Sequence, residues 1–237
     1  MIKYFFPNKI LSLKNKFFNY LILLLLILTF VGLVYALVIS PPDFIQGDSV
    51  RIMYVHVPSS FMSLALFGII GFSSICNLIF KIKIMPLISK SVAPIGFTFA
   101  LITIFTGSFW GKPTWGTWWA WDARLTSMLI LFLFYLAFIL TWRLIKNFNK
   151  ANKISSIIGI VGLINIPIIK YSVTWWSTLH QTSSITLTSA PTIHSDMLTP
   201  LIIMFLVMLF YSVIIFLMIY KTELMKLKIY IKKNNSY

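Results

Sequence analysis

Tryptophan is concentrated in one short part of the chain, residues 110–124, which we term the tryptophan-rich loop. Five of the twelve residues at 110–121 are tryptophan, and an aspartate follows at 122. If this stretch is helical, four of its side chains share one face because their spacing is i, i+3, i+4 and i+7: Trp115, Trp118, Trp119 and Asp122. Trp121 would point elsewhere. Rigid indole rings lose little rotamer entropy on binding, so such a face suits a flat aromatic ligand better than a small polar substrate.

The same loop has two other interpretations. Tryptophan commonly anchors helices at a membrane interface. On composition alone, an anchor and a ligand-binding surface are equally well supported. The density and one-sided placement of the tryptophans favour ligand binding. The segment at 107–113 resembles a phosphate-binding loop, but its spacing is one residue short and Pro113 stands where a Ser or Thr would hold magnesium. We therefore do not expect a nucleotide site.

Two histidines flank the tryptophan-rich loop along the chain. His56 precedes it and His180 follows it. Two neutral imidazoles on opposite faces of a macrocycle are one way to hold haem iron. An isolated histidine at a membrane edge is, however, more often a hydrogen-bonded structural residue. His194 lies in a Ser/Thr-rich stretch that is typical of a solvated loop, and we leave it out of the candidate site.

Long apolar segments must position these residues. The chain is 59% hydrophobic and 11% charged, whereas a soluble domain carries about 25% charged residues. Its apolar runs are continuous and long enough to cross a bilayer as helices, and they lack the alternation of a barrel strand. We expect an all-α integral membrane protein, a single polytopic domain over 1–237, with six spans at about 20–39, 61–80, 92–110, 125–142, 154–170 and 198–220.

Basic residues predict the orientation of these spans. Of the 20 lysines and arginines, 16 fall at the termini and in the second–third and fourth–fifth connections. This distribution places both termini inside, in the cytoplasm or matrix. The outer side then holds all three histidines and seven of the eight tryptophans. The net charge of +15 is thus explained by topology, and we do not expect nucleic-acid binding.

Several motifs resemble those of a known family. The string Trp115-Gly-x-Trp-Trp-x-Trp-Asp122 resembles the "WWD" signature of haem-handling proteins. Together with Tyr54-Val-His-Val-Pro58 and Trp175-Trp-Ser-Thr-Leu-His-Gln181, it resembles CcmC, the haem exporter C family of system I cytochrome c biogenesis. The resemblance covers roughly residues 40–185, and the chain length favours this family over longer WWD proteins. One departure is Met128, where many members have an acidic residue.

The resemblance implies a haem site. It implies that His56 and His180 are the axial ligands of haem b. It also implies that five residues of the tryptophan-rich loop bind the porphyrin: Trp115, Trp118, Trp119, Trp121 and Asp122. Outer cations such as Arg51, Lys112 and Arg124 have two options. They can pair with haem propionates, or with nearby aspartates and lipid phosphate.

The function that follows is delivery of haem, not catalysis. We expect a multi-pass inner membrane protein, bacterial or mitochondrial, that presents haem at its outer face. The resemblance implies transfer to the haem chaperone CcmE, with CcmD and the CcmA–CcmB transporter in one complex. Two rivals stay open. A bis-histidine b-type cytochrome would ligate haem within the bilayer, and a small-molecule permease would carry polar residues at mid-membrane.

Overall fold

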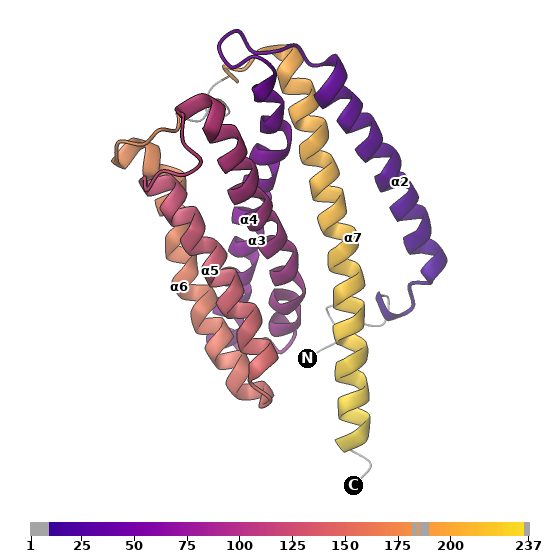
Figure 1. Cartoon of the computed structure of the whole chain (residues 1–237). Coiled ribbons are helices and arrows are strands. Elements are labelled where there is room, and N and C mark those ends of the chain that lie inside the picture. The colour runs from indigo at the N-terminus through magenta and orange to yellow at the C-terminus, as the bar shows by residue number, and fades with distance from the viewer. Residues whose placement is uncertain (1–9, 182–183, 185–189, 235–237) are drawn as a thin grey trace.

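The computed structural model describes residues 10–181, 184 and 190–234 and contains six helices long and apolar enough to cross a membrane (Figure 1). Their number confirms the sequence prediction. Lys3 and Lys9, which contribute to the charge distribution, lie outside the described residues, as does part of the connection at 182–189. The helices are α2 (Asn15–Val34), α3 (Met53–Phe80), α4 (Met85–Trp115), α5 (Ala123–Leu144), α6 (Phe148–Trp175) and α7 (Ser195–Asn234).

Two short segments of tighter or wider helix extend this set. The π-helical segment η1 (Tyr35–Ile39) continues α2, and the 3-10 helix η2 (Asp48–Ile52) leads into α3. The helices are longer than the apolar runs, because the residues at their ends are helical without being part of a continuous apolar run. As a result His56 lies inside the first turns of α3, not before it, and α6 runs through Pro167 to Trp175.

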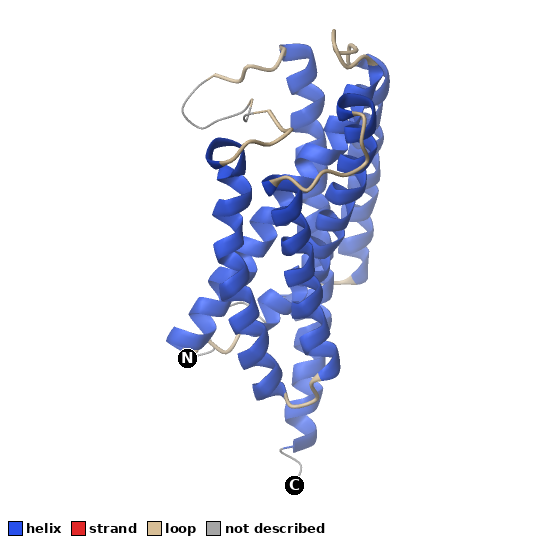
Figure 2. Cartoon of the chain, turned by 60° about the vertical axis from the view of Figure 1, so that its left-hand side comes forward, coloured by secondary structure: helices blue, strands red, loops and turns tan. Residues whose placement is uncertain are grey.

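Helices α3, α4, α5 and α6 form one group, with α7 packed against α3 and α4, and α2 packed against α7 (Figure 1). Loops join the helices at the two ends of the bundle (Figure 2). The centre of the group is filled by large side chains such as Tyr54, Phe67 and Tyr135, all fully buried. The Tyr135 hydroxyl donates to the Ser63 carbonyl at 2.7 Å. It can reach that carbonyl because α4 has Gly96 there: a Cβ at Gly96 would lie 2.0 Å from the hydroxyl oxygen.

Small and amide side chains join α3 to α6. A Cβ on Gly71 would collide with Leu163, and one on Gly159 would collide with Ser74, so both glycines allow close helix approach. Asn77 Nδ2 donates to Asn152 Oδ1 and to Ser156 Oγ, each at 2.9 Å. These bonds satisfy polar groups that lipid would leave unpaired.

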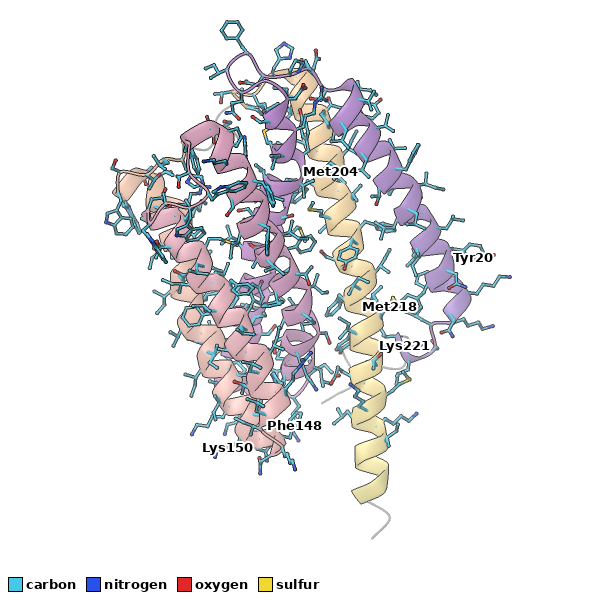
Figure 3. The ribbon with its side chains drawn as sticks, viewed as in Figure 1. Tyr20, Phe148, Lys150, Met204, Met218 and Lys221 are labelled. Atoms are coloured by element: carbon cyan, nitrogen blue, oxygen red, sulfur yellow. The ribbon has the colours of Figure 1, made fainter. Side chains whose placement is uncertain are left out.

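Basic residues gather at the end of the bundle opposite the tryptophan-rich loop. Lys150 on α6 and Lys221 on α7 lie toward this end (Figure 3). Here Lys90 Nζ of α4 contacts Glu223 Oε2 of α7 at 2.5 Å, and Lys226 Nζ contacts Glu223 Oε1 at 2.8 Å. Since Glu223 is buried, this ion pair fixes the long helix α7 to the four-helix group.

Candidate haem site at the tryptophan-rich end

The tryptophan-rich loop is helical only up to Trp115. Gly116 follows in the left-handed region, with φ +76°, and its amide donates to the Lys112 carbonyl at 3.1 Å. Glycine is the residue that adopts this conformation without strain, so it ends α4 here. Residues 116–122 are non-helical until α5 begins at Ala123. The condition under which four loop side chains would share one helical face is therefore not met.

The loop tryptophans instead fall into two groups by exposure. Trp118 and Trp121 are 53% and 77% exposed, whereas Trp115 and Trp119 are partly buried. Trp118 packs edge-on against Phe109 at 5.5 Å, and Trp119 against Trp121 at 5.6 Å, between ring centroids. The Trp119 Nε1 atom is buried and has no hydrogen-bond partner among the described residues.

Asp122 connects the loop to the segment that carries His180. Its Oδ1 accepts from the Leu125 amide at 2.8 Å and so caps the start of α5. Its Oδ2 accepts from the Leu179 amide at 3.2 Å and lies 3.5 Å from His180 Nδ1. The carboxylate is only 9% exposed. Asp122 therefore accepts backbone amides both from the start of α5 and from the segment just before His180.

His180 lies between Asp122 and Trp115. The Trp115 and His180 rings meet edge-to-face with centroids 4.7 Å apart. The pKa of His180 is lowered to about 4, mainly by burial and also by the positive charge of Arg124, while Asp122 opposes both. His180 is therefore a neutral imidazole at pH 7, which is the form that ligates a metal. Its buried Nδ1 faces Asp122 Oδ2 at the outer limit of hydrogen-bond distance.

His56 projects from α3 onto the outer end of α4. Its Nδ1 lies 3.1 Å from Thr106 Oγ1, and its ring is edge-on to Trp110 with centroids 5.7 Å apart. Trp110 is held in turn by a hydrogen bond from its Nε1 to Gln46 Oε1, at 2.7 Å. A Cβ on Gly107 would come within 3.0 Å of His56 Cε1, so the ring rests on the α4 backbone.

The fold brings the two histidines together. His56 and His180 are close enough to interact electrostatically with each other and with Arg124. Each packs against a different tryptophan from the last turns of α4, Trp110 and Trp115. These contacts unite segments far apart in the sequence at one end of the bundle.

Other candidate residues lie apart from this group or have partners of their own. His194 is 69% exposed and lies 3.7 Å from Asp196, through its Nδ1 and the carboxylate. Arg51 Nε bonds Asp48 at 3.0 Å, and Lys112 Nζ bonds the Gly116 carbonyl at 3.1 Å. Of the three outer cations, the histidines' electrostatic partner is Arg124.

Sequence reasoning missed the residues that hold the histidines in place: Thr106, Gly107, Trp110 and the Leu179 amide. Trp110 was visible as part of the tryptophan-rich loop. Thr106 and Gly107 are two of several small or polar residues in this span, and nothing in the sequence indicates that His56 packs against them.

The donor set fits an iron macrocycle better than a bare ion. In the described ranges, no cluster of three or more His, Cys, Asp or Glu side chains is placed to hold a metal ion. Two imidazoles would supply two ligands to haem iron, and the macrocycle would supply the other four itself. The indole rings offer flat apolar surface, and the unpaired Trp119 Nε1 offers a hydrogen-bond donor. The fold is that of a polytopic helical membrane protein, and the residues of the candidate site fit haem.

Comparison with known proteins identifies the family. Residues 1–235 match the model of the family described as "Heme exporter protein C" (CcmC), and the chain belongs to this family. It is 40% identical over 203 residues to heme exporter protein C of Haemophilus influenzae, covering 86% of this chain and 82% of that protein. It is 42% identical over 191 residues to a putative cytochrome c biosynthesis ccmC-like mitochondrial protein of Marchantia polymorpha, covering 81% of each.

A third relative, heme exporter protein C of Bradyrhizobium diazoefficiens, is 37% identical over 198 residues, which are 75% of that protein and 84% of this chain. Family membership confirms haem handling in cytochrome c maturation, in a transport or scaffold role. The bacterial and mitochondrial relatives and the six apolar helices agree with a multi-pass inner membrane protein.

Proposed function

We propose that this chain binds haem b between His56 and His180 and delivers it to the haem chaperone CcmE. The observation that carries the proposal is the convergence of two otherwise distant histidines at the tryptophan-rich end, with His180 held beside the Asp122 carboxylate. The low pKa of His180, about 4, keeps its imidazole neutral and ready to ligate iron.

The tryptophans have graded roles in this proposal. Trp115 supports His180 and borders the porphyrin, and the buried Trp119 Nε1 donates to a polar edge group such as a propionate. Trp118 and Trp121 are exposed, so they cover the porphyrin from the open side and can separate from it when haem leaves. Asp122 holds the loop and the segment that carries His180 in fixed positions relative to each other, through its hydrogen bonds to the Leu125 and Leu179 amides.

The site faces the outer side of the membrane in this proposal. The support is the charge distribution: 16 of 20 basic residues belong to the opposite end or to the termini. The connections there are short, residues 81–84 and 145–147, and leave no room for a nucleotide-binding fold. Energy from ATP would therefore come from a partner, the CcmA–CcmB transporter, with CcmD in the same complex.

Purification with and without the chaperone tests this function. The full chain alone should carry protohaem with a six-coordinate, bis-histidine spectrum, and co-expressed CcmE should acquire haem from it. A protein that cycles stably between ferric and ferrous states, but never loads the chaperone, would instead be a b-type cytochrome. A purified chain without any haem, under conditions where the chaperone is loaded, would contradict the proposal.

A further inference from the structure

The contact between His56 and Thr106 indicates which ring nitrogen of His56 is protonated. His56 Nδ1 and Thr106 Oγ1 lie 3.1 Å apart, and this distance alone allows either atom to donate. Neutral imidazole has one protonated and one unprotonated nitrogen, and only the unprotonated one can bind a metal. The direction of this hydrogen bond therefore decides which ring nitrogen is available.

The other contacts of Thr106 are with carbonyl groups of α4, at Ile102 and, at 3.4 Å, at Thr103, and they fix that direction. Thr106 Oγ1 lies 2.7 Å from the Ile102 carbonyl, one turn earlier in α4. A carbonyl only accepts, and a hydroxyl has a single hydrogen, so the hydroxyl donates to Ile102 and has only lone pairs left for His56. His56 Nδ1 must then be the donor, and the proton of the neutral ring resides there.

Gly107 sets the direction in which the ring points. An added Cβ at Gly107 would lie 3.0 Å from His56 Cε1 and 3.5 Å from Nδ1, so the Nδ1–Cε1 edge faces the α4 backbone. Nε2 is not among the ring atoms within 4 Å of that position, so it lies on the side of the ring away from Gly107. Metal-bound histidines usually donate their other ring N–H to a neighbouring acceptor, which fixes both tautomer and orientation.

We propose that Thr106 is a positioning residue that holds His56 in the Nδ1–H tautomer, so that Nε2 is the atom presented to the haem iron. The part of this proposal that concerns haem iron rests on the proposed function. The tautomer of His56 can be measured on the protein without haem. The proposal assigns different supports to the two ligands: a threonine hydroxyl for His56 and the Asp122 carboxylate for His180.

Two substitutions separate positioning from packing. Thr106→Val keeps the shape of the side chain and removes the acceptor, whereas Thr106→Ser keeps the hydroxyl. Thr103→Val is the matched control: it removes a hydroxyl that makes the same kind of bond within α4, Oγ1 to the Phe99 carbonyl at 2.8 Å, and it keeps the Thr103 backbone group that hydrogen-bonds His56.

Nitrogen-15 NMR of the haem-free full chain, labelled at its three histidines, reads the tautomer directly. His180→Asn and His194→Asn assign the His56 signals. Wild type, Thr106→Ser and Thr103→Val should show protonated Nδ1 and unprotonated Nε2, and Thr106→Val should lose this preference. Hemin titration of the same variants should show affinity roughly 10–100-fold lower in Thr106→Val alone.

Three results would overturn the proposal: protonated Nε2 in wild type, Thr106→Val that matches Thr103→Val in the NMR spectrum, or Thr106→Val with wild-type hemin affinity. Failure of the proposed function looks different. In that case His56→Ala keeps the wild-type haem spectrum and affinity, while the wild-type NMR spectrum still shows the Nδ1–H tautomer.

Discussion

Asp122 Oδ2 lies 3.5 Å from His180 Nδ1, while Oδ1 of the same carboxylate caps α5 through the Leu125 amide. One side chain thus joins the start of a membrane helix to a candidate haem ligand. These two roles can be separated, because asparagine caps a helix about as well as aspartate but carries no charge.

We predict that Asp122→Asn retains helix stability and weakens haem binding by roughly tenfold, since outer partners of a ligating histidine typically contribute this much or more. Asp122→Ala should weaken haem binding further and also lower the unfolding midpoint, by a cap loss of about 1 kcal/mol. Haem titration and thermal unfolding in detergent measure the two effects.

Asn147 provides the matched control for the cap. Its Oδ1 accepts from the Lys150 amide at 2.9 Å and caps α6 at the opposite end of the bundle. Asn147→Ala should lose similar stability and keep normal haem affinity. Equal loss of haem in Asn147→Ala and Asp122→Ala would mean that Asp122 acts on stability alone.

The second prediction concerns Gly107. Its missing side chain leaves room for the His56 ring, since a Cβ there would lie 3.0 Å from Cε1. Gly107→Ala should displace the ring by a few tenths of an ångström, lower haem affinity roughly tenfold and alter the spectrum. Gly68→Ala is the control, because nothing lies within 4 Å of its Cβ position. Identical haem binding in both variants would show that His56 does not need this contact.

How much of this could be predicted from sequence differs between fold and site. The six helices follow from uninterrupted apolar runs, which signal spans directly. The end of α4 did not follow, because a left-handed Gly116 interrupts a stretch whose tryptophan spacing suggests a continuous helix. His56 and Thr106 meet because of the register between α3 and α4, which depends on side-chain packing along both helices and leaves no mark in local sequence.

The third prediction separates ligand binding from membrane anchoring in the tryptophan-rich loop. Replacing Trp115, Trp118 and Trp119 together by alanine should lower haem per purified molecule, each ring contributing roughly 0.5–1.5 kcal/mol beyond its burial. Among the three single variants, Trp115→Ala should lower haem content most, because Trp115 also packs against His180. Pyridine haemochrome assays relative to protein concentration measure the ratio.

Trp142, at the opposite end of the bundle beside Lys90, is the control for the loss of a large ring. Trp142→Ala should reduce protein abundance without changing haem per molecule. If the triple variant behaves in the same way, with lower abundance and normal haem content, the loop is an anchor.

The fourth prediction concerns orientation. Reporter fusions at Lys150 and Ser184 should give opposite signals, cytoplasmic or matrix for Lys150 and external for Ser184. The reason is that α6 separates the two positions and the basic residues cluster at the Lys150 end. Matching signals from both fusions would contradict the six-span arrangement.

The most direct test of the account is the haem spectrum of histidine variants purified with their haem. His56→Ala and His180→Ala should each lose the six-coordinate bis-histidine spectrum and most of the bound haem, because each removes one axial ligand. Added imidazole should partly restore both, while the exposed His194→Ala should match wild type. A wild-type spectrum in either His56→Ala or His180→Ala would contradict the central claim that these two residues hold the iron.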